Sequence, residues 1–266
     1  MMRHDPDGAL AHRRLWNGLP AAGVASIVAP ILQPGRGATD VTTILITGAN
    51  RGIGLALAAA AVRQGQHVIA TARTPKPGDT LSALGAKLEC LTLDVTSRES
   101  LEALGRTLAG RAIDVLVVNA GMHNSRGGLD DRNNDAASWS ALFATNVVGA
   151  FQTVRTLLPN VVAVHGKIAF ISSRMGSSTR AAGNAYGYRA TKAAVSNIAA
   201  NLAVELKPRG VAVASYHPGW VKTDMGGSGA EITVEESARG LLARIEALSL
   251  ATSGAFESYD GTTIPF

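Results

Sequence analysis

Cysteine and aromatic residues are scarce in this sequence, and each shortage excludes a class of function. Cys90 is the single cysteine among 266 residues, and aromatic residues make up 5% of the chain. One cysteine cannot form an internal disulfide, and the apolar run around Cys90 favours a small core residue over a nucleophile. The formal net charge is +5, but Lys and Arg form no dense tract and few rings could stack on bases. We therefore expect no nucleic-acid binding.

Long apolar runs and clusters of metal ligands are missing as well. After the N-terminal region, no run reaches the roughly 18 apolar residues that a membrane span needs, so we expect no span. His217 has no cluster of His, Cys or Asp around it, so we expect no metal site. The remaining composition, 46% hydrophobic and 17% charged, suits one α/β domain with a large core.

Residues 1–40 differ in composition from the rest of the chain. They contain scattered Pro and Gly and one apolar patch at 19–32. A disordered extension is the preferred interpretation, because the first strand is expected only near residue 42. An export signal that begins with Arg13 and Arg14 and an amphipathic surface segment are the alternatives. We therefore expect an N-terminal extension at 1–40 and a single domain at 41–266.

From residue 42 onward, short apolar segments alternate with longer Ala- and Leu-rich segments. The short segments predict strands at 43–47, 67–71, 88–93, 114–118, 167–171, 211–216 and 254–258. The longer segments predict helices at 53–64, 97–108, 136–158 (closed by Pro159), 188–206 and 234–247. Fully apolar strands separated by helices indicate a parallel sheet covered on both faces. The predicted fold is α/β, a Rossmann-type doubly wound sheet of about seven mostly parallel strands.

The turn after the first predicted strand, residues 47–54, has the pattern of a phosphate-binding loop. Gly48 permits a tight turn, Gly52 lets a pyrophosphate approach the backbone, and Gly54 allows the helix to pack closely on the strand. The helix N-terminus then offers free N–H groups to the phosphates. The same turn supplies three further candidate cofactor contacts, Asn50, Arg51 and Ile53. A glycine turn without a ligand is the alternative.

The end of the second predicted strand favours NADP over NAD. An acidic residue there would bind the ribose 2′-OH, but the chain has Thr71, Ala72 and Arg73 with no Asp or Glu nearby. Two guanidinium groups, those of Arg51 and Arg73, could bind a 2′-phosphate in a forked geometry. Two solvated surface arginines are the alternative.

Polar residues also follow the third and fourth predicted strands. Ligands bind at the carboxyl ends of strands in open α/β sheets. Asp94 could accept a hydrogen bond from an adenine amino group, or it could be a helix N-cap or turn residue. The candidate cofactor contacts at these two strand ends are Asp94, Val95, Asn119, Ala120 and Gly121.

Tyr188 and Lys192 lie four residues apart and would share one face of a helix. A cation beside a phenol stabilises the phenolate, so the tyrosine could act as an acid or base below its usual pKa of about 10. A packed ring with a solvated charge is the alternative for an isolated pair. Tyr186 is followed four residues later by Ala190 and has no such cation.

Together these motifs resemble the short-chain dehydrogenase/reductase family. The matches run in family order over about 42–266. They comprise the turn at 47–54, Asp94, residues 119–121, Asn146, residues 171–173, the stretch 188–192 and residues 217–219. The stretches 217–227 and 260–266 look more narrowly like the C-factor/sniffer-type carbonyl reductases.

The resemblance implies a role for each catalytic candidate. Tyr188 would donate a proton to a carbonyl oxygen, and Lys192 would lower the pKa of Tyr188 and hold the nicotinamide ribose. Ser173, rather than Ser172, would hydrogen-bond the substrate oxygen, and Asn146 would hold a water for proton supply. The alternatives are purely structural roles: a turn hydroxyl for the serine and a helix-kink residue for Asn146. The resemblance also implies cofactor contacts at Pro218, Gly219, Val221 and Thr223.

We therefore expect an NADP(H)-dependent oxidoreductase that prefers NADPH over NADH and reduces a small aldehyde or ketone. The Gly-rich segment 222–232 is expected to be a mobile lid over the substrate. A cytoplasmic homodimer or homotetramer is expected, because the family regenerates its cofactor in the cytoplasm and pairs subunits through two of these helices. A non-catalytic NADP(H)-binding sensor on the same fold is the alternative. The variable loops around the pocket leave the carbonyl substrate unidentified.

Overall fold

In the described part of the chain, seven strands form one parallel sheet. The computed structural model describes residues 41–75 and 80–266, so the predicted extension at 1–40 lies outside the described residues. The strands follow the order β3-β2-β1-β4-β5-β6-β7, and every neighbouring pair is parallel. The strands are β1 (Thr43–Ile46), β2 (His67–Ala72), β3 (Leu88–Thr92), β4 (Val115–Val118), β5 (Lys167–Ile171), β6 (Ala212–His217) and β7 (Phe256–Ser258). The predicted parallel sheet is confirmed.

The strand order makes the sheet doubly wound. The chain starts at β1 in the middle, builds outward to β3, and then returns to build β4 through β7 on the other side. The connecting helices are α1 (Gly52–Arg63), α2 (Arg98–Thr107), α3 (Ala136–Phe143), α4 (Ala150–Val162), α5 (Tyr186–Leu206) and α6 (Val234–Ala247). The direction of winding reverses between β1 and β4, which is where such sheets form a ligand crevice at the carboxyl ends of their strands.

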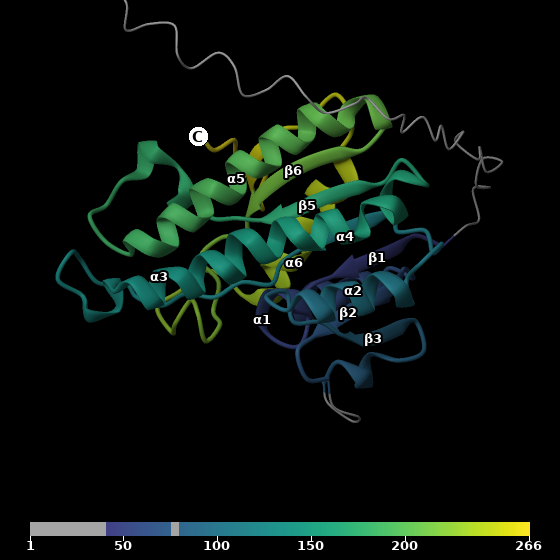
Figure 1. The fold of residues 1–266 in the computed structure, drawn as a ribbon, viewed down its shortest axis with the longest axis horizontal. Coiled ribbons are helices and arrows are strands. Elements are labelled where there is room, and N and C mark those ends of the chain that lie inside the picture. The colour runs from purple at the N-terminus through teal and green to yellow at the C-terminus, as the bar shows by residue number, and fades with distance from the viewer. Residues whose placement is uncertain (1–40, 76–79) are drawn as a thin grey trace, which may run out of the picture. The chain divides into compact units, whose positions relative to one another are not determined.

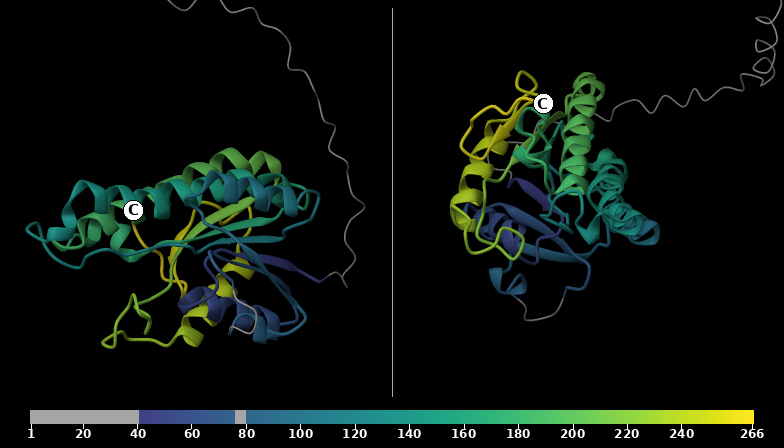
Figure 2. Two further views of the ribbon diagram at one scale, coloured as in Figure 1. Left: turned by 60° about the horizontal axis from the view of Figure 1, so that its bottom comes forward. Right: turned by 90° about the vertical axis from the view of Figure 1, so that its left-hand side faces the viewer.

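Alternation of side chains along the strands builds two hydrophobic cores, one on each face of the sheet. On β1, Leu45 belongs to the core shared with α2, α4 and α5. Its neighbours Ile44 and Ile46 belong to the core shared with α1 and α6. Figures 1 and 2 show α4 and α5 on one side of the sheet and α1 and α6 on the other. Because both faces of the sheet are buried at its centre, β1 and β4 are almost entirely apolar, and such segments predicted the parallel sheet.

The long helix predicted at 136–158 differs from the expectation. α3 passes into a π-helical segment, Ala144–Gly149, which passes into α4. Pro159 lies inside α4, so the prediction that it closes the helix is wrong. A proline removes one backbone hydrogen bond, but tertiary contacts hold the following turn. Asn160, for example, is buried and donates from Nδ2 to the carbonyl of Leu108 at 2.6 Å.

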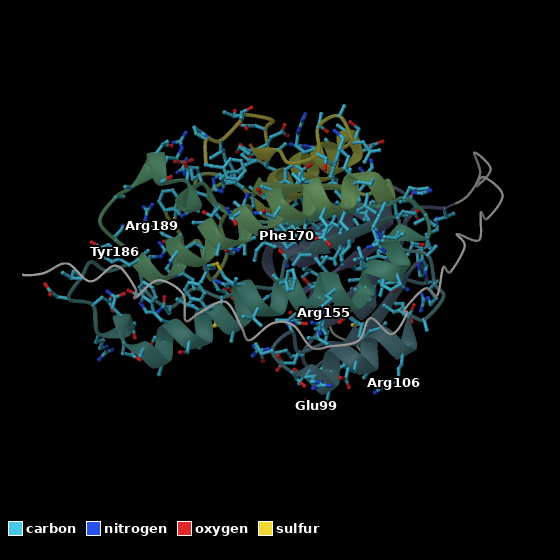
Figure 3. All side chains as sticks on the ribbon, turned by 45° about the horizontal axis from the view of Figure 1, so that its top comes forward. Glu99, Arg106, Arg155, Phe170, Tyr186 and Arg189 are labelled. Atoms are coloured by element: carbon cyan, nitrogen blue, oxygen red, sulfur yellow. The ribbon has the colours of Figure 1, made fainter. Side chains whose placement is uncertain are left out.

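α5 begins at Tyr186, earlier than the predicted start at Tyr188. Ala185 precedes it with a φ of +50°, a left-handed conformation that costs a non-glycine residue free energy. The backbone N–H of Ala185 donates to the carbonyl of Gly127 at 2.8 Å, which helps to hold that conformation. Figure 3 labels Tyr186 and Arg189 at this end of α5. The start of α5 is therefore set by the loop that packs against it.

None of the helices within residues 41–75 and 80–266 combines the length and apolar character that a bilayer crossing requires. Within the same residues, no group of three or more His, Cys, Asp or Glu side chains is arranged to hold a metal ion.

Candidate active site

Thr47 joins the two turns that flank the switch between β1 and β4. Its Oγ1 accepts hydrogen bonds from the backbone N–H groups of Asn119 at 2.9 Å and Ala120 at 3.0 Å. In return, Asn119 donates from Nδ2 to the carbonyls of Thr47 at 2.8 Å and Gly48 at 3.1 Å. The predicted cofactor residues of both turns therefore form one rigid edge. The sequence interpretation missed Thr47, although it is the first residue of the glycine pattern.

Each glycine of this turn is required for its own structural reason. Gly48 and Gly52 have φ values of +63° and +54°, which other residues rarely adopt. A Cβ at Gly54 would lie 2.4 Å from the carbonyl oxygen of Gly48, so only glycine fits there. α1 has no acidic residue in its first turn and no side-chain cap, so its first N–H groups have no side-chain acceptor. This cradle fits the pyrophosphate of a dinucleotide.

The two arginines proposed for the 2′-phosphate are both exposed. Arg73 follows the end of β2, and its charge contributes to a lowered pKa at Asp94. The Nη1 of Arg51 lies 3.2 Å from Oδ2 of Asp224 in the segment 222–232. The side chains of this pair are 65% and 84% exposed, so water screens the ion pair and a phosphate could compete for the guanidinium.

Asp94 takes part in a local turn. Its Oδ1 accepts hydrogen bonds from the backbone N–H and the hydroxyl of Thr96, at 2.9 and 2.7 Å, and these bonds lower the pKa of the carboxyl. The N-cap of α2 is Ser97, whose hydroxyl accepts from Ser100 N, so the N-cap alternative for Asp94 is wrong. The contact of Asp94 with adenine stays a prediction, as does that of the adjacent Val95.

Asn146 lies in the π-helical segment and connects the loop after β4 to α5. It is 2% exposed. Its Oδ1 accepts from Met122 N at 2.8 Å, while Nδ2 donates to Met122 O at 2.9 Å and to Thr191 Oγ1 at 3.1 Å. The side-chain amide is thus engaged by the protein itself. The predicted role in holding a water stays a prediction. In the structure, Asn146 connects the loop after β4, at Met122, to α5, at Thr191.

The two serines after β5 differ in their surroundings. Ser172 Oγ donates to the carbonyl of Lys192 at 3.1 Å and lies 2.8 Å from Ser196 Oγ. Its hydroxyl is therefore used in packing β5 against α5. Ser173 lies beside Tyr188, to which its side chain is hydrogen-bonded. The geometry supports the choice of Ser173 over Ser172.

Burial controls the acidity of Tyr188 and Lys192. Desolvation raises the pKa of Tyr188 to about 12, and the hydrogen bond with Ser173 opposes this only in part. Desolvation also lowers the pKa of Lys192 to about 8. The ammonium donates to the carbonyl of Ile171 at 2.8 Å and lies 5.7 Å from the centroid of the Tyr188 ring. The pKa of Tyr188 is therefore raised by burial and not lowered as the sequence predicted, and only the hydrogen bond with Ser173 opposes the rise. Tyr188 is held protonated at neutral pH.

His123 is a site residue that the sequence interpretation missed. Its ring centroid lies 4.3 Å from that of Tyr188, at an interplanar angle of 39°. Burial lowers the pKa of His123, and the charges of Arg126 and Lys192 lower it further, so the imidazole is neutral at neutral pH. The available signal was its position shortly after the turn at 119–121, in a loop that otherwise looked uninformative.

The segment 222–232 is tied to the rest of the site at several points. Arg126 donates to the carbonyls of Met225 and Gly226, the latter at 2.9 Å. Trp220 Nε1 also donates to the Gly226 carbonyl at 2.9 Å. A Cβ at Gly52 would lie 3.5 Å from the Thr223 methyl group, so the segment reaches the glycine turn. These contacts tie the segment to the loop after β4 and to the glycine turn, and its role as a mobile lid stays a prediction.

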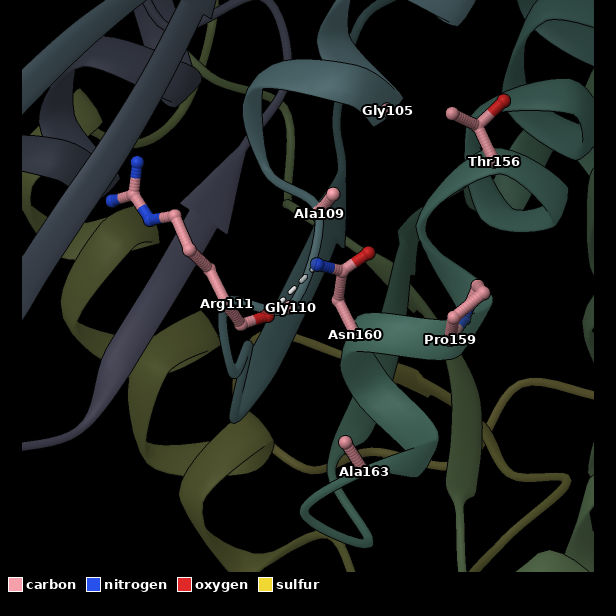
Figure 4. A pocket seen from close by; sticks show the side chains of 8 residues that line it. All are labelled: Gly105, Ala109, Gly110, Arg111, Thr156, Pro159, Asn160 and Ala163. Carbon is pink, nitrogen blue, oxygen red and sulfur yellow. Dashed lines mark hydrogen bonds between the residues drawn. The ribbon is translucent and has the colours of Figure 1, made fainter. Parts of the chain in front are cut away.

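A cavity of about 270 Å³ between α2 and α4 lies apart from these residues (Figure 4). Its lining consists mainly of small side chains, with Asn160 hydrogen-bonded to the carbonyl of Arg111 at 2.8 Å. The guanidinium of Arg111 is paired with Glu89 at 2.6 Å. None of the predicted catalytic or cofactor-binding residues lines this cavity.

Comparisons with known proteins identify the family of this chain. The short chain dehydrogenase family model matches residues 42–231. C-signal of Myxococcus xanthus is 34% identical over 168 residues, which cover 62% of this chain and all of that protein. Carbonyl reductase Sniffer of D. melanogaster superposes with a TM-score of 0.80 at 28% identity, covering 85% of this chain and all of Sniffer. NADPH-bound carbonyl reductase from chicken fatty liver superposes with a TM-score of 0.77 at 30% identity, covering 85% and 99%. The chain belongs to the short-chain dehydrogenase/reductase family of oxidoreductases, with C-signal and Sniffer among its relatives.

Proposed function

We propose that this protein is an NADPH-dependent carbonyl reductase that converts a small aldehyde or ketone to an alcohol, reversibly. The observation that carries the proposal is the buried trio at the start of α5. Tyr188 is protonated and hydrogen-bonded to Ser173. The Lys192 ammonium lies 5.7 Å from the centroid of the Tyr188 ring. A proton donor, an oxygen-binding hydroxyl and a cation in one buried site match the needs of carbonyl reduction.

NADPH is the cofactor that the residues fit. When bound, it supplies the hydride that reduces the carbonyl carbon. The N-terminus of α1 would receive the pyrophosphate, and Arg51 and Arg73 would receive the 2′-phosphate. The NADPH-bound chicken carbonyl reductase is a structural neighbour that supports this choice. The proposed contacts are Gly48, Asn50, Arg51, Gly52, Ile53, Gly54, Arg73, Asp94, Val95, residues 119–121, Tyr188, Lys192, Pro218, Gly219, Val221 and Thr223.

The chain's own groups would then move one proton. Ser173 and Tyr188 would hydrogen-bond the carbonyl oxygen and place it against the phenol. As the carbon is reduced, Tyr188 would give its proton to that oxygen, leaving a tyrosinate stabilised by the charge of Lys192. Solvent would return the proton to Tyr188. Burial keeps Tyr188 protonated but also makes it a weaker acid, so we expect the proton transfer to depend on stabilisation of the tyrosinate by Lys192.

The test replaces Tyr188 by Phe and screens NADPH oxidation over aldehydes and ketones, with NADH in parallel. Y188F is expected to lose at least about 100-fold in kcat, the contribution typical of a positioned acid, while NADPH binding followed by fluorescence is retained. Y186F is the matched control, since Tyr186 starts the same helix but is 38% exposed. Full activity in Y188F would exclude this mechanism. NADPH binding without turnover of any carbonyl by the wild type would favour the cofactor-binding sensor.

Self-association is a further part of the proposal. Val148 and Phe151, around the start of α4, are 54% and 38% exposed, and Val204 on α5 is 77% exposed. Exposed apolar side chains on neighbouring helices suit a contact between copies of the chain. Light scattering on the purified protein tests this, and a V148K/V204K variant should shift a dimer or tetramer toward monomer.

A further inference from the structure

A second cavity, of about 190 Å³, lies at the carboxyl ends of β6 and β7, next to Ser173 in the chain. Arg174, which directly follows that serine, lines it together with Arg180. His217 at the end of β6 forms part of its wall, and so does Trp220 at the base of the lid. The cavity also has two acidic residues in its lining, Glu231 and Asp260. The cavity therefore combines charged groups with a lining residue, Arg174, that follows the proposed catalytic serine in the chain.

His217 is the buried ring in the wall of this cavity, and both arginines act on it. The ring is 7% exposed, and burial lowers its pKa to about 3. Arg174 and Arg180 lower the pKa further, and Asp260, which raises it, has the smallest influence of the four. Glu231 is not among the charges that affect the ring. His217 is consequently a neutral hydrogen-bonding group in a field dominated by two guanidinium groups.

The two arginines have free bonding capacity, while one of the two acidic residues, Asp260, already accepts a hydrogen bond. Nδ1 of His217 is buried without a hydrogen-bond partner among the described residues. Neither Arg174 nor Arg180 forms an ion pair within residues 41–75 and 80–266. Asp260, by contrast, accepts from Thr262 N at 3.0 Å. An anion entering the cavity would thus meet unused donors, since a buried polar group without a partner carries a cost that a ligand can remove.

We infer that this cavity is a subsite for a carboxylate at the far end of the carbonyl substrate, held by Arg174 and Arg180 with His217 in the wall. The inference rests on the proposed function and deepens it, because it names oxo-carboxylic acids as the substrate class. The carbonyl oxygen of the substrate would bind at Ser173 and Tyr188. Its carboxylate would bind at Arg174, the residue that follows Ser173. Because Ser173 and Arg174 are consecutive residues, we expect a spacer of a few carbons or one ring to bridge the two positions.

The kinetic test compares two aldehydes that differ only in charge, 4-formylbenzoate and its methyl ester. The ratio of kcat/KM for acid over ester is measured in the wild type, R174Q, R180Q and the double variant. The wild type should prefer the acid, and R174Q should reduce that ratio about tenfold or more, through KM for the acid. R155Q is the control, since Arg155 is exposed on α4 and lines neither cavity (Figure 3), and it should keep the wild-type ratio. A wild-type ratio of one or below, unchanged in R174Q and R180Q, would overturn the inference.

A binding test does not depend on turnover and separates the possible sources of the anion. The NADPH-loaded protein is titrated calorimetrically with benzoate, benzamide and inorganic phosphate. Benzoate should bind, benzamide should not, and R174Q and R180Q should each weaken benzoate at least about fivefold. Binding of neither anion, or of phosphate alone, overturns the substrate subsite. Benzoate binding that depends on Arg174, in a protein whose Y188F variant stays active, would uphold the subsite and refute the proposed mechanism instead.

Discussion

Replacing Lys192 by Met should stabilise the protein at neutral pH while abolishing its activity. Lys192 is 6% exposed and carries its charge into the core beside Tyr188. A methionine has a similar length and no charge, so it can fill the same space without the cost of burying an ammonium. The stability of this site and its proposed chemistry therefore make opposite demands on position 192.

The magnitude follows from the pKa of Lys192. Burial lowers it from 10.5 to about 8. At about 1.4 kcal/mol per pH unit, the charged side chain destabilises the folded state by about 3 kcal/mol at pH 7. K192M also leaves the carbonyl of Ile171 without its hydrogen bond, which costs about 1–3 kcal/mol. We expect the free energy of unfolding to rise by about 0–2 kcal/mol at pH 7.

The sign of the pH dependence gives a sharper signature than the value at one pH. Between about pH 8 and 10.5, the unfolded chain keeps a proton on Lys192 that the folded chain has lost, so the wild type gains stability as the pH rises. The variant lacks this gain. K192M should therefore be more stable than the wild type at pH 7 and less stable at pH 10.

Urea unfolding followed by circular dichroism at pH 7 and pH 10 measures both proteins. K207M is the control, because Lys207 is exposed in the turn after α5. It should leave the difference between the two pH values unchanged. The reasoning is refuted if K192M is less stable than the wild type by the same amount at both pH values. NADPH oxidation by K192M should fall at least about 100-fold.

Three further predictions concern the surroundings of Tyr188 and the cofactor turn. H123F should keep kcat within about twofold of the wild type, whereas H123A should lower it about 2- to 10-fold, because only the alanine removes the ring that packs on Tyr188. Equal loss in both variants would instead indicate a polar role for His123. G54A should lower the free energy of unfolding by about 1–3 kcal/mol and weaken NADPH binding, since its Cβ would meet a backbone oxygen at 2.4 Å, and calorimetry would show both effects. D224N should change stability by less than about 0.5 kcal/mol but lower KM for NADPH, not for NADH, because it frees Arg51 to bind the 2′-phosphate. An identical change in KM for both cofactors would contradict that role of Arg51.

The local sequence pattern was sufficient to predict a segment's structure where a single property of that segment decides it. The apolar strands predicted a parallel sheet because burial on both faces leaves no room for polar alternation. Gly48, Gly52 and Gly54 could be assigned from their spacing, because a positive φ or a close backbone approach excludes a side chain. Pro159 shows the limit of such rules. Its effect on the helix depends on contacts such as that of Asn160 with Leu108, which are distant in sequence.

The sequence by itself determined the fold class, the glycine turn and the pairing of Tyr188 with Lys192 on one helix face. These features depend on residue type and spacing, and both are local. Tertiary structure alone decided that Tyr188 is held protonated, since the pKa follows from desolvation by groups drawn from several elements. It also decided that His123 packs on Tyr188 and that Arg174, Arg180 and His217 share one cavity. Neither the acidity of a buried group nor the lining of a cavity can be assigned from one segment, because each depends on what the rest of the chain brings to it.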